Sequence, residues 1–269
     1  MNPGHARPAI AAPAHERAMP GLLRGAWLRL LVVGSALWIA LTWATVDTGN
    51  INLVPGVIAL GAFLGPLAFV VYVYERARDV PVPTLLTCFI VGGALGVSAA
   101  GVLEYRTLVA LHALPTLGIG VIEESCKLIV PLGAFVLWRY RSEADGLLIG
   151  VASGMGFAAF ETMGYGMTML LLSQGRIDAV GELLFVRGVL APAGHGAWTG
   201  FAAAMLWRTR LRPGPRSKIA FALAFLTVVV LHGLWDAANS MTVQLLFGAA
   251  SLVLLGWRIR LATGEPPAP

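Results

Sequence analysis

Residues 52–74 read NLVPGVIALGAFLGPLAFVVYVY and contain no charged side chain. A helix of about 20 apolar residues is long enough to cross a hydrocarbon core of about 30 Å. This stretch is therefore predicted to be a transmembrane helix. Seven more segments have the same character, at roughly 26–46, 84–103, 114–138, 146–172, 183–207, 219–239 and 241–258. The sequence predicts an all-α fold, a polytopic transmembrane helix bundle of about eight spans.

The composition of the whole chain agrees with this fold class. Of its 269 residues, 57% are apolar and 12% are charged, whereas soluble domains carry about 25% charged residues. Glycine occurs 32 times. Pairs such as Gly61/Gly65 and Gly150/Gly154 have the small-xxx-small spacing that lets membrane helices pack closely. The two cysteines lie inside apolar runs and are too few for a disulfide framework or a cysteine zinc site.

The positions of the basic residues predict the orientation. Most of the 19 Lys and Arg residues lie in the two termini and in alternate loops, so they gather on one side of the predicted spans. The positive-inside rule places that side in the cytoplasm. Both termini are therefore predicted to be cytoplasmic, in a multi-pass protein of the cell (plasma) membrane. The net charge of +5 is a sign of topology, and no nucleic-acid partner is expected.

Ionisable side chains lie in the middle of four consecutive spans, from the fourth to the seventh. One charge at the bilayer centre costs roughly 2.5–3.5 kcal/mol. Counting about 1.5 Å per residue from the nearest loop charge puts these groups at one depth, in the middle to outer half of the membrane. They are therefore predicted to face one another inside the bundle. The set is Glu123, Glu124, Lys127, Glu161, His195, His232 and Asp236.

Local spacings suggest how these groups pair. Lys127 lies at i,i+4 from Glu123 and at i,i+3 from Glu124, so it is expected to pair with one glutamate and leave the other free as a base or ligand. His232 and Asp236 are also at i,i+4. The carboxylate could fix the imidazole tautomer, or both groups could bind one metal.

His195 lies in Pro192-Ala193-Gly194-His195-Gly196, where proline frees a carbonyl and the glycines allow another helix or a substrate strand to come close. Two other polar positions are expected to be only structural. Arg187 is expected to extend to the outer interface. Glu104 is expected to lie in water at the end of a span.

These motifs resemble the PrsW family of intramembrane proteases, within the wider group of CAAX-processing and bacteriocin-processing membrane proteases. The Glu-Glu-x-x-Lys motif stands at 123–127, Phe-x-x-x-Glu at 157–161, the histidine of a small-residue helix at His195, and His-x-x-x-Asp at 232–236. Relatives in the CAAX branch carry Arg after the glutamate pair and His in the second motif. Lys127 and Glu161 thus favour the PrsW branch.

The resemblance covers roughly residues 115–240 and implies hydrolysis of peptide bonds in membrane-anchored proteins. Known relatives cut an anti-sigma factor, so the implied substrate class includes regulatory proteins of that kind. The group has been described both as metalloproteases and as metal-independent glutamate proteases, and the sequence leaves both open. The implied partners are a membrane-anchored protein substrate and the lipid bilayer, and the oligomeric state is left open.

The catalytic hypothesis begins with the glutamate pair. Glu124, alone or with Glu123, is the predicted general base that activates a water. Lys127 is predicted to tune the pair, and Asp236 to orient His232.

A second part of the hypothesis concerns the water. Glu161, His195 and His232 are predicted to position it, directly or through a divalent metal, and zinc suits such a His/Glu set best. A protonated histidine would stabilise the oxyanion.

Two other functions stay open at this point. Buried acids and histidines also form the ion pathways of proton- or ion-coupled transporters. The second alternative is a non-catalytic membrane scaffold that descends from a protease and whose active site has decayed. The proposed division of the chain is a disordered cytoplasmic tail at 1–25, spans one to three at 26–113, a catalytic core of spans four to seven at 114–240, and the last span with a short cytoplasmic tail at 241–269.

Overall fold

The computed structural model describes residues 24–77, 80–137 and 140–264, and within these ranges it contains helices and no strand. The predicted all-α bundle is confirmed. The predicted disordered tail lies almost wholly outside the described residues. The division of the chain into four parts stays a prediction.

Six helices in the described ranges are long and apolar enough to cross a membrane, by length and composition. Each follows from an apolar run, and α2 begins after the single turn η3 (Ile51–Leu53). They are α1 (Ala26–Thr48), α2 (Val54–Tyr74), α3 (Val82–Leu111), α6 (Glu143–Leu172), α9 (Pro215–Ala237) and α10 (Met241–Thr263). All six match predicted spans, and α3 extends well beyond the predicted end at residue 103.

The other two predicted spans, the fourth and the sixth, are broken helices. The fourth consists of α4 (Thr116–Lys127) and α5 (Ile129–Val136), and it begins directly after Pro115, as predicted. The sixth consists of α7 (Ile177–Leu190), the turn η4 (Ala191–Ala193) and α8 (His195–Leu211). Pro192 lies in η4 and cannot donate a backbone hydrogen bond. Within the described ranges the structure thus has six candidate spans and two broken helices, and the predicted number of about eight spans is approximate.

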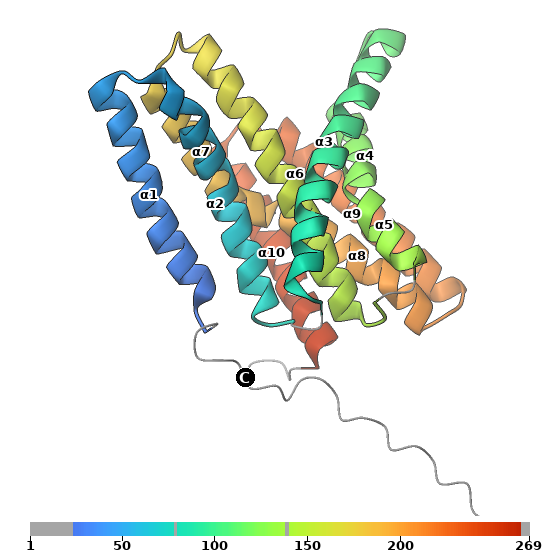
Figure 1. Cartoon of the computed structure of the whole chain (residues 1–269). Helices are drawn as coiled ribbons and strands as arrows, with labels where there is room; N and C mark the ends of the chain where they lie inside the picture. The colour runs from blue at the N-terminus through green and yellow to red at the C-terminus, as the bar shows by residue number, and fades with distance from the viewer. Residues whose placement is uncertain (1–23, 78–79, 138–139, 265–269) are drawn as a thin grey trace, which may run out of the picture.

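Helix α6 is the centre of the bundle (Figure 1). It packs against α8, α3 and α2, and 83% of its most apolar window is buried, against 11% for the outer helix α1. Glycines make this packing close: a Cβ at Gly154 would lie 2.4 Å from the carbonyl oxygen of His195. The structure therefore supports a packing role for Gly150 and Gly154. Their small size allows the start of α8 to lie directly against α6.

The two ends of the described chain lie on one side of the bundle, because α1 begins and α10 ends at the lower side in Figure 1. This arrangement agrees with termini on one side of a membrane. The assignment of that side to the cytoplasm stays a prediction.

The contact between α3 and α6 predicts a strong glycine effect. A Cβ at Gly156 would lie 1.9 Å from the carbonyl oxygen of Phe89, which is backbone and cannot rotate away. We expect Gly156→Ala to lower the free energy of unfolding in detergent by about 1–3 kcal/mol or more, because the two helices must separate. Gly164→Ala, on the same helix, is the control because its Cβ would meet nothing within 4 Å. Equal stability of the two variants would contradict the close contact.

Candidate active site

A buried lysine holds the two adjacent glutamates of α4. Lys127 Nζ lies 3.0 Å from Glu123 Oε2 and 2.8 Å from Glu124 Oε1. All three residues are buried, with Glu123 7%, Glu124 1% and Lys127 0% exposed. The expectation that Lys127 pairs with one glutamate and frees the other was therefore wrong. At i,i+3 and i,i+4, one long ammonium side chain reaches both carboxylates.

The break between α4 and α5 places this lysine. Helix α4 ends at Lys127, and the backbone carbonyl of Lys127 accepts a hydrogen bond of 2.8 Å from Ser153 Oγ on α6. Such a bond satisfies a carbonyl that has no partner inside its own helix. The ammonium also lies 4.4 Å from the centre of the Phe157 ring. Helix α6 therefore supports both the backbone and the charge of this residue.

The imidazole of His232 joins α9 to this pair. Its Nδ1 lies 2.8 Å from Glu124 Oε1, and its Nε2 lies 3.5 Å from Glu123 Oε2 and 3.4 Å from Asp236 Oδ2. An ionised carboxylate only accepts hydrogen bonds, so an ionised Glu124 accepts this bond from His232 in the form that is protonated at Nδ1. The ring of Trp198 stacks on the imidazole with a centroid distance of 4.8 Å. His232 is thus fixed by one short hydrogen bond and one aromatic face.

A second histidine–carboxylate pair joins α8 to α6. His195 Nε2 lies 3.4 Å from Glu161 Oε2. The same oxygen accepts a hydrogen bond of 2.6 Å from Arg187 Nη2, and Arg187 Nε donates to Thr162 Oγ1 at 3.0 Å. The expectation that Arg187 extends to the outer interface was wrong, because a partly buried carboxylate on α6, that of Glu161, holds its guanidinium. The His195 and His232 rings are 5.7 Å apart between centroids, so the two pairs are neighbours.

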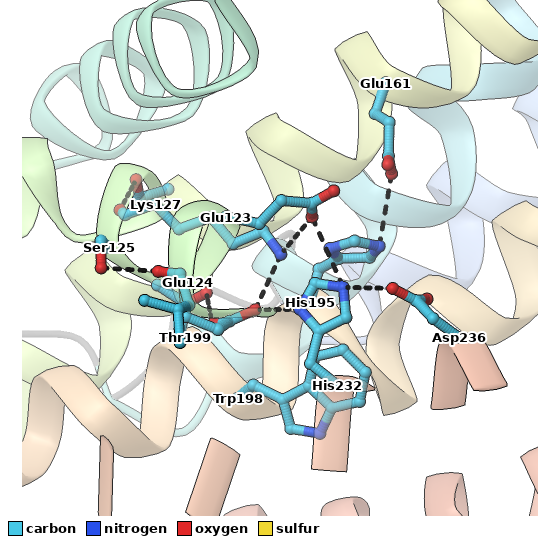
Figure 2. Close-up of polar contacts among 12 residues, drawn as sticks. Glu123, Glu124, Ser125, Lys127, Glu161, His195, Trp198, Thr199, His232 and Asp236 are labelled. Carbon is cyan, nitrogen blue, oxygen red and sulfur yellow. Dashed lines mark hydrogen bonds and ion pairs between the residues drawn. The ribbon is translucent and has the colours of Figure 1, made fainter. Parts of the chain in front are cut away.

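The two pairs face an open cavity of about 1040 Å³. Figure 2 shows carboxylates from different helices directed toward the two imidazoles. The residues of the predicted set that line the cavity are Glu123, Glu161, His195, His232 and Asp236. Glu124 and Lys127 are not in its wall and lie behind it, in contact with Glu123 and His232. The structure therefore brings all seven predicted residues into one connected network.

The PrsW family model, described as a family of intramembrane metalloproteases, matches residues 80–259. The chain belongs to the PrsW family. As a member of this family it is an intramembrane peptidase, an integral membrane protein that acts on a protein substrate in the bilayer. The match includes α3 and most of α10, beyond the stretch 115–240 that carries the motifs. No curated protein and no solved structure matches the chain.

The description of the PrsW family implies a metal, and the predicted ligands were Glu161, His195 and His232. Glu161 and His195 are in contact, but both nitrogens of His232 already face carboxylates. Among the described residues, no group of three or more His, Cys, Asp or Glu side chains is placed to hold a metal ion. The side-chain arrangement does not fit a three-ligand zinc site, and no catalytic step below is routed through a metal.

Sequence reasoning missed several residues of this PrsW-family site. Arg187 and Glu104 both line the cavity, and Glu104 Oε1 is buried without a hydrogen-bond partner in the described structure. Helix α3 does not end near Glu104 but continues to Leu111. The apolar residues after Glu104 were a usable signal for this extension. Trp198 and Thr199 follow His195 on α8, and the Thr199 hydroxyl lies 3.5 Å from Glu124 Oε2.

Proposed function

We propose that this PrsW-family protease hydrolyses a peptide bond of a membrane-anchored protein inside the cavity between α3, α4, α6, α8 and α9, with a water activated by Glu123. One observation carries the proposal. Five carboxylates and imidazoles of the predicted set, from four separate helices, line the same open cavity, and the sequence predicts them at a depth where ionisable groups are costly. This arrangement supports chemistry on a water and a peptide group better than a transporter path or a non-catalytic scaffold.

Glu123 is proposed as the general base in preference to Glu124, which the sequence favoured. Glu123 lines the cavity, whereas Glu124 is 1% exposed and does not. A base must lie within hydrogen-bond reach of the proton that it removes. Glu124 instead accepts hydrogen bonds from Lys127 and His232. Its proposed role is to hold the imidazole of His232, and the role of Lys127 is to balance the charge of both carboxylates.

The remaining groups would act on the peptide carbonyl and the leaving amine. Glu123 takes a proton from the attacking water and passes it to the nitrogen that leaves when the C–N bond breaks. His232 lines the cavity, and its Nε2 lies 3.5 Å from Glu123 Oε2. In its protonated form, His232 would donate a hydrogen bond to the oxyanion of the tetrahedral intermediate. Asp236 would orient His232, and the pair of His195 and Glu161 would position the water.

The proposed substrate is a protein with a single membrane span, and the proposed location is the cell (plasma) membrane. A regulatory protein such as an anti-sigma factor fits this substrate class. A divalent metal, with zinc the best chemical match, stays a prediction that the side-chain arrangement does not favour.

The test compares membrane-protein fragments in cells that express the wild type, Glu123→Gln or Glu182→Gln at equal abundance. Glu182 is an exposed residue of α7 and provides the matched control. We expect new protein termini inside or near single spans with the wild type and with Glu182→Gln, and none with Glu123→Gln. Identical fragments in all three strains, with folded protein and several growth stresses sampled, would contradict proteolysis.

A further inference from the structure

We propose that Glu104 is a specificity-determining residue, which selects substrates that carry a Lys or Arg side chain close to the scissile bond, on its outer side. This inference rests on the proposed function and adds a feature of its substrate. Glu104 lies on α3, outside the four motifs that carry the family resemblance. It lines the same cavity as Glu123, the proposed base.

The first step is the level of Glu104 along the bundle. A Cβ at Gly96 would lie 3.6 Å from the carbonyl oxygen of Cys126, so these residues of α3 and α4 are level with one another. The two helices pack together, and the short connection at residues 112–115 makes them antiparallel. Counted from that level toward the connection, Glu104 lies about 12 Å away and Glu123 about 4.5 Å, at about 1.5 Å per residue. Glu104 therefore lies beyond Glu123, toward the connection.

This difference in level assigns Glu104 to one part of the substrate. An extended peptide covers about 7 Å with about two residues, at about 3.3 Å per residue. The Leu111 end of α3 lies on the opposite side of the bundle from the two ends of the described chain (Figure 1), which is the predicted outer side. Glu104 is thus placed to contact a substrate side chain one to three residues from the scissile bond, on the outer side.

The second step is the shape of the wall beside Glu104. Val97, Ala100 and Gly101 line the cavity with Glu104, and spacings of three and four residues put all of them on one face of α3. A Cβ at Gly101 would meet nothing within 4 Å. The wall next to the carboxylate is therefore apolar and has free space. The methylene chain of a Lys or Arg side chain suits such a surface, because it can lie along apolar groups while its charged end reaches a polar one.

The third step is the lack of an internal partner. The other acids of the cavity wall each lie near a basic side chain of the protein: Glu123 near Lys127 at 3.0 Å, Glu161 near Arg187 at 2.6 Å, and Asp236 near His232 at 3.4 Å. Glu104 makes no ion pair with any described residue, and its Oε1 is buried without a hydrogen-bond partner there. Its side chain is nevertheless partly exposed, in the cavity wall.

A cationic substrate side chain would supply the partner that the protein lacks. A buried polar oxygen without a partner lowers the stability of a protein, so it calls for an explanation. An ammonium or guanidinium group forms charge-assisted hydrogen bonds with a carboxylate, whereas an acidic side chain in the same place would be repelled. Lys and Arg are rare inside membrane spans. Such a contact would therefore separate a substrate from most other single-span proteins.

The rival interpretation makes Glu104 a structural residue, and a stability measurement separates the two. A structural carboxylate would lose a stabilising contact in Glu104→Leu, so the midpoint of thermal unfolding in nanodiscs would fall. A carboxylate kept for a substrate has no such contact to lose. We expect the midpoint of Glu104→Leu to equal or exceed that of the wild type, and a clear fall would contradict the inference.

The decisive experiment measures charge preference with a substrate found by the fragment comparison. Each of the three residues on the outer side of its scissile bond is changed in turn to Lys, Gln or Glu. For the wild type in nanodiscs, we expect kcat/KM of the best Lys form to exceed that of the matching Gln form by about 10–100-fold, the range of a hydrogen bond to a charged group. The Glu form should be the poorest.

The protease variants assign this preference to one residue. In Glu104→Gln we expect the ratio between the Lys and Gln forms to fall to near one. Glu104→Lys should prefer the Glu form. Glu182→Gln removes an exposed acid of α7 outside the cavity and should keep the wild-type ratio. If Glu104→Gln does not fold, Glu104→Leu serves in its place, because it also removes the charge.

Three results would overturn the inference. The first is a wild type that cleaves all charge forms equally, and the second is an unchanged ratio in folded Glu104→Gln. The third is an equal loss of the ratio in Glu182→Gln, which would assign the preference to the overall charge of the protein. The proposed function fails separately, if Glu123→Gln cleaves the Gln form as fast as the wild type does. Cleavage that requires Glu123 but shows no charge preference refutes only the role of Glu104.

Discussion

Glu123→Gln is expected to lower kcat by about 10²–10⁴-fold, which is the range that a positioned general base contributes. The amide keeps the shape of the side chain and cannot accept the proton of a water. Glu123 lies in the wall of the cavity, so KM should change little. The measurement is the initial rate of cleavage of a purified single-span substrate in nanodiscs, at saturating substrate, with each variant checked for folding.

Glu124→Gln is the informative comparison, because the two glutamates are adjacent and differ in what they contact. Glu124 holds His232 Nδ1 at 2.8 Å and Lys127 Nζ at 2.8 Å. Its loss should therefore reduce both the rate and the thermal stability, whereas Glu123→Gln should mainly reduce the rate. A folded Glu123→Gln variant with wild-type kcat, beside an inactive Glu124→Gln, would return the role of base to Glu124.

Lys127→Met is expected to destabilise the protein by about 3–5 kcal/mol, the cost of removing one partner of a buried ion pair. The ammonium is 0% exposed and balances two carboxylates. Without the Lys127 ammonium, Glu123 and Glu124 lie side by side in a low-dielectric site, and α4 has no other cationic side chain to balance them. The loss of stability is measured by unfolding the protein in mild detergent with heat or denaturant.

Two control variants give this prediction its specificity. Lys218→Met removes an exposed lysine near the start of α9 and should leave stability nearly unchanged. The triple variant Glu123→Gln/Glu124→Gln/Lys127→Met removes the charges together, and it should regain much of the lost stability, because no buried charge is left unpaired. A stable Lys127→Met, or a triple variant no better than the single one, would contradict the charge-balancing role.

The helical bundle could be predicted from the sequence because membrane spans depend mainly on local composition. The apolar run at 52–74 contains α2, and Pro115 marks the start of α4. The site could be located for a related reason. Charges in a bilayer must find one another, so the similar depths of Glu124, Glu161 and His232 indicated one cluster.

The rest depended on contacts between distant helices. Hydropathy does not record the break after Lys127, where Pro131 has no N–H to donate to the Lys127 carbonyl. The partner of the freed carbonyl, Ser153, lies on the distant helix α6. The partner of Arg187 could not be read from its own helix, since Glu161 belongs to another. The sequence also could not show which of the two adjacent glutamates lines the cavity, because both contact His232 on the distant helix α9 and only Glu123 is in the cavity wall.

The two broken helices also bear on the biogenesis of the protein. Helix α4 has 12 residues, three of which are Glu123, Glu124 and Lys127, and α7 has 14 residues. Neither is long enough to cross a hydrocarbon core of about 30 Å by itself. The partners that satisfy α4 are Ser153 on α6 and His232 on α9, both synthesised later. Helix α4 therefore cannot reach its final place as an independently inserted span. The last third of the chain, which includes His232, must be synthesised before the charged side chains of α4 have all their partners.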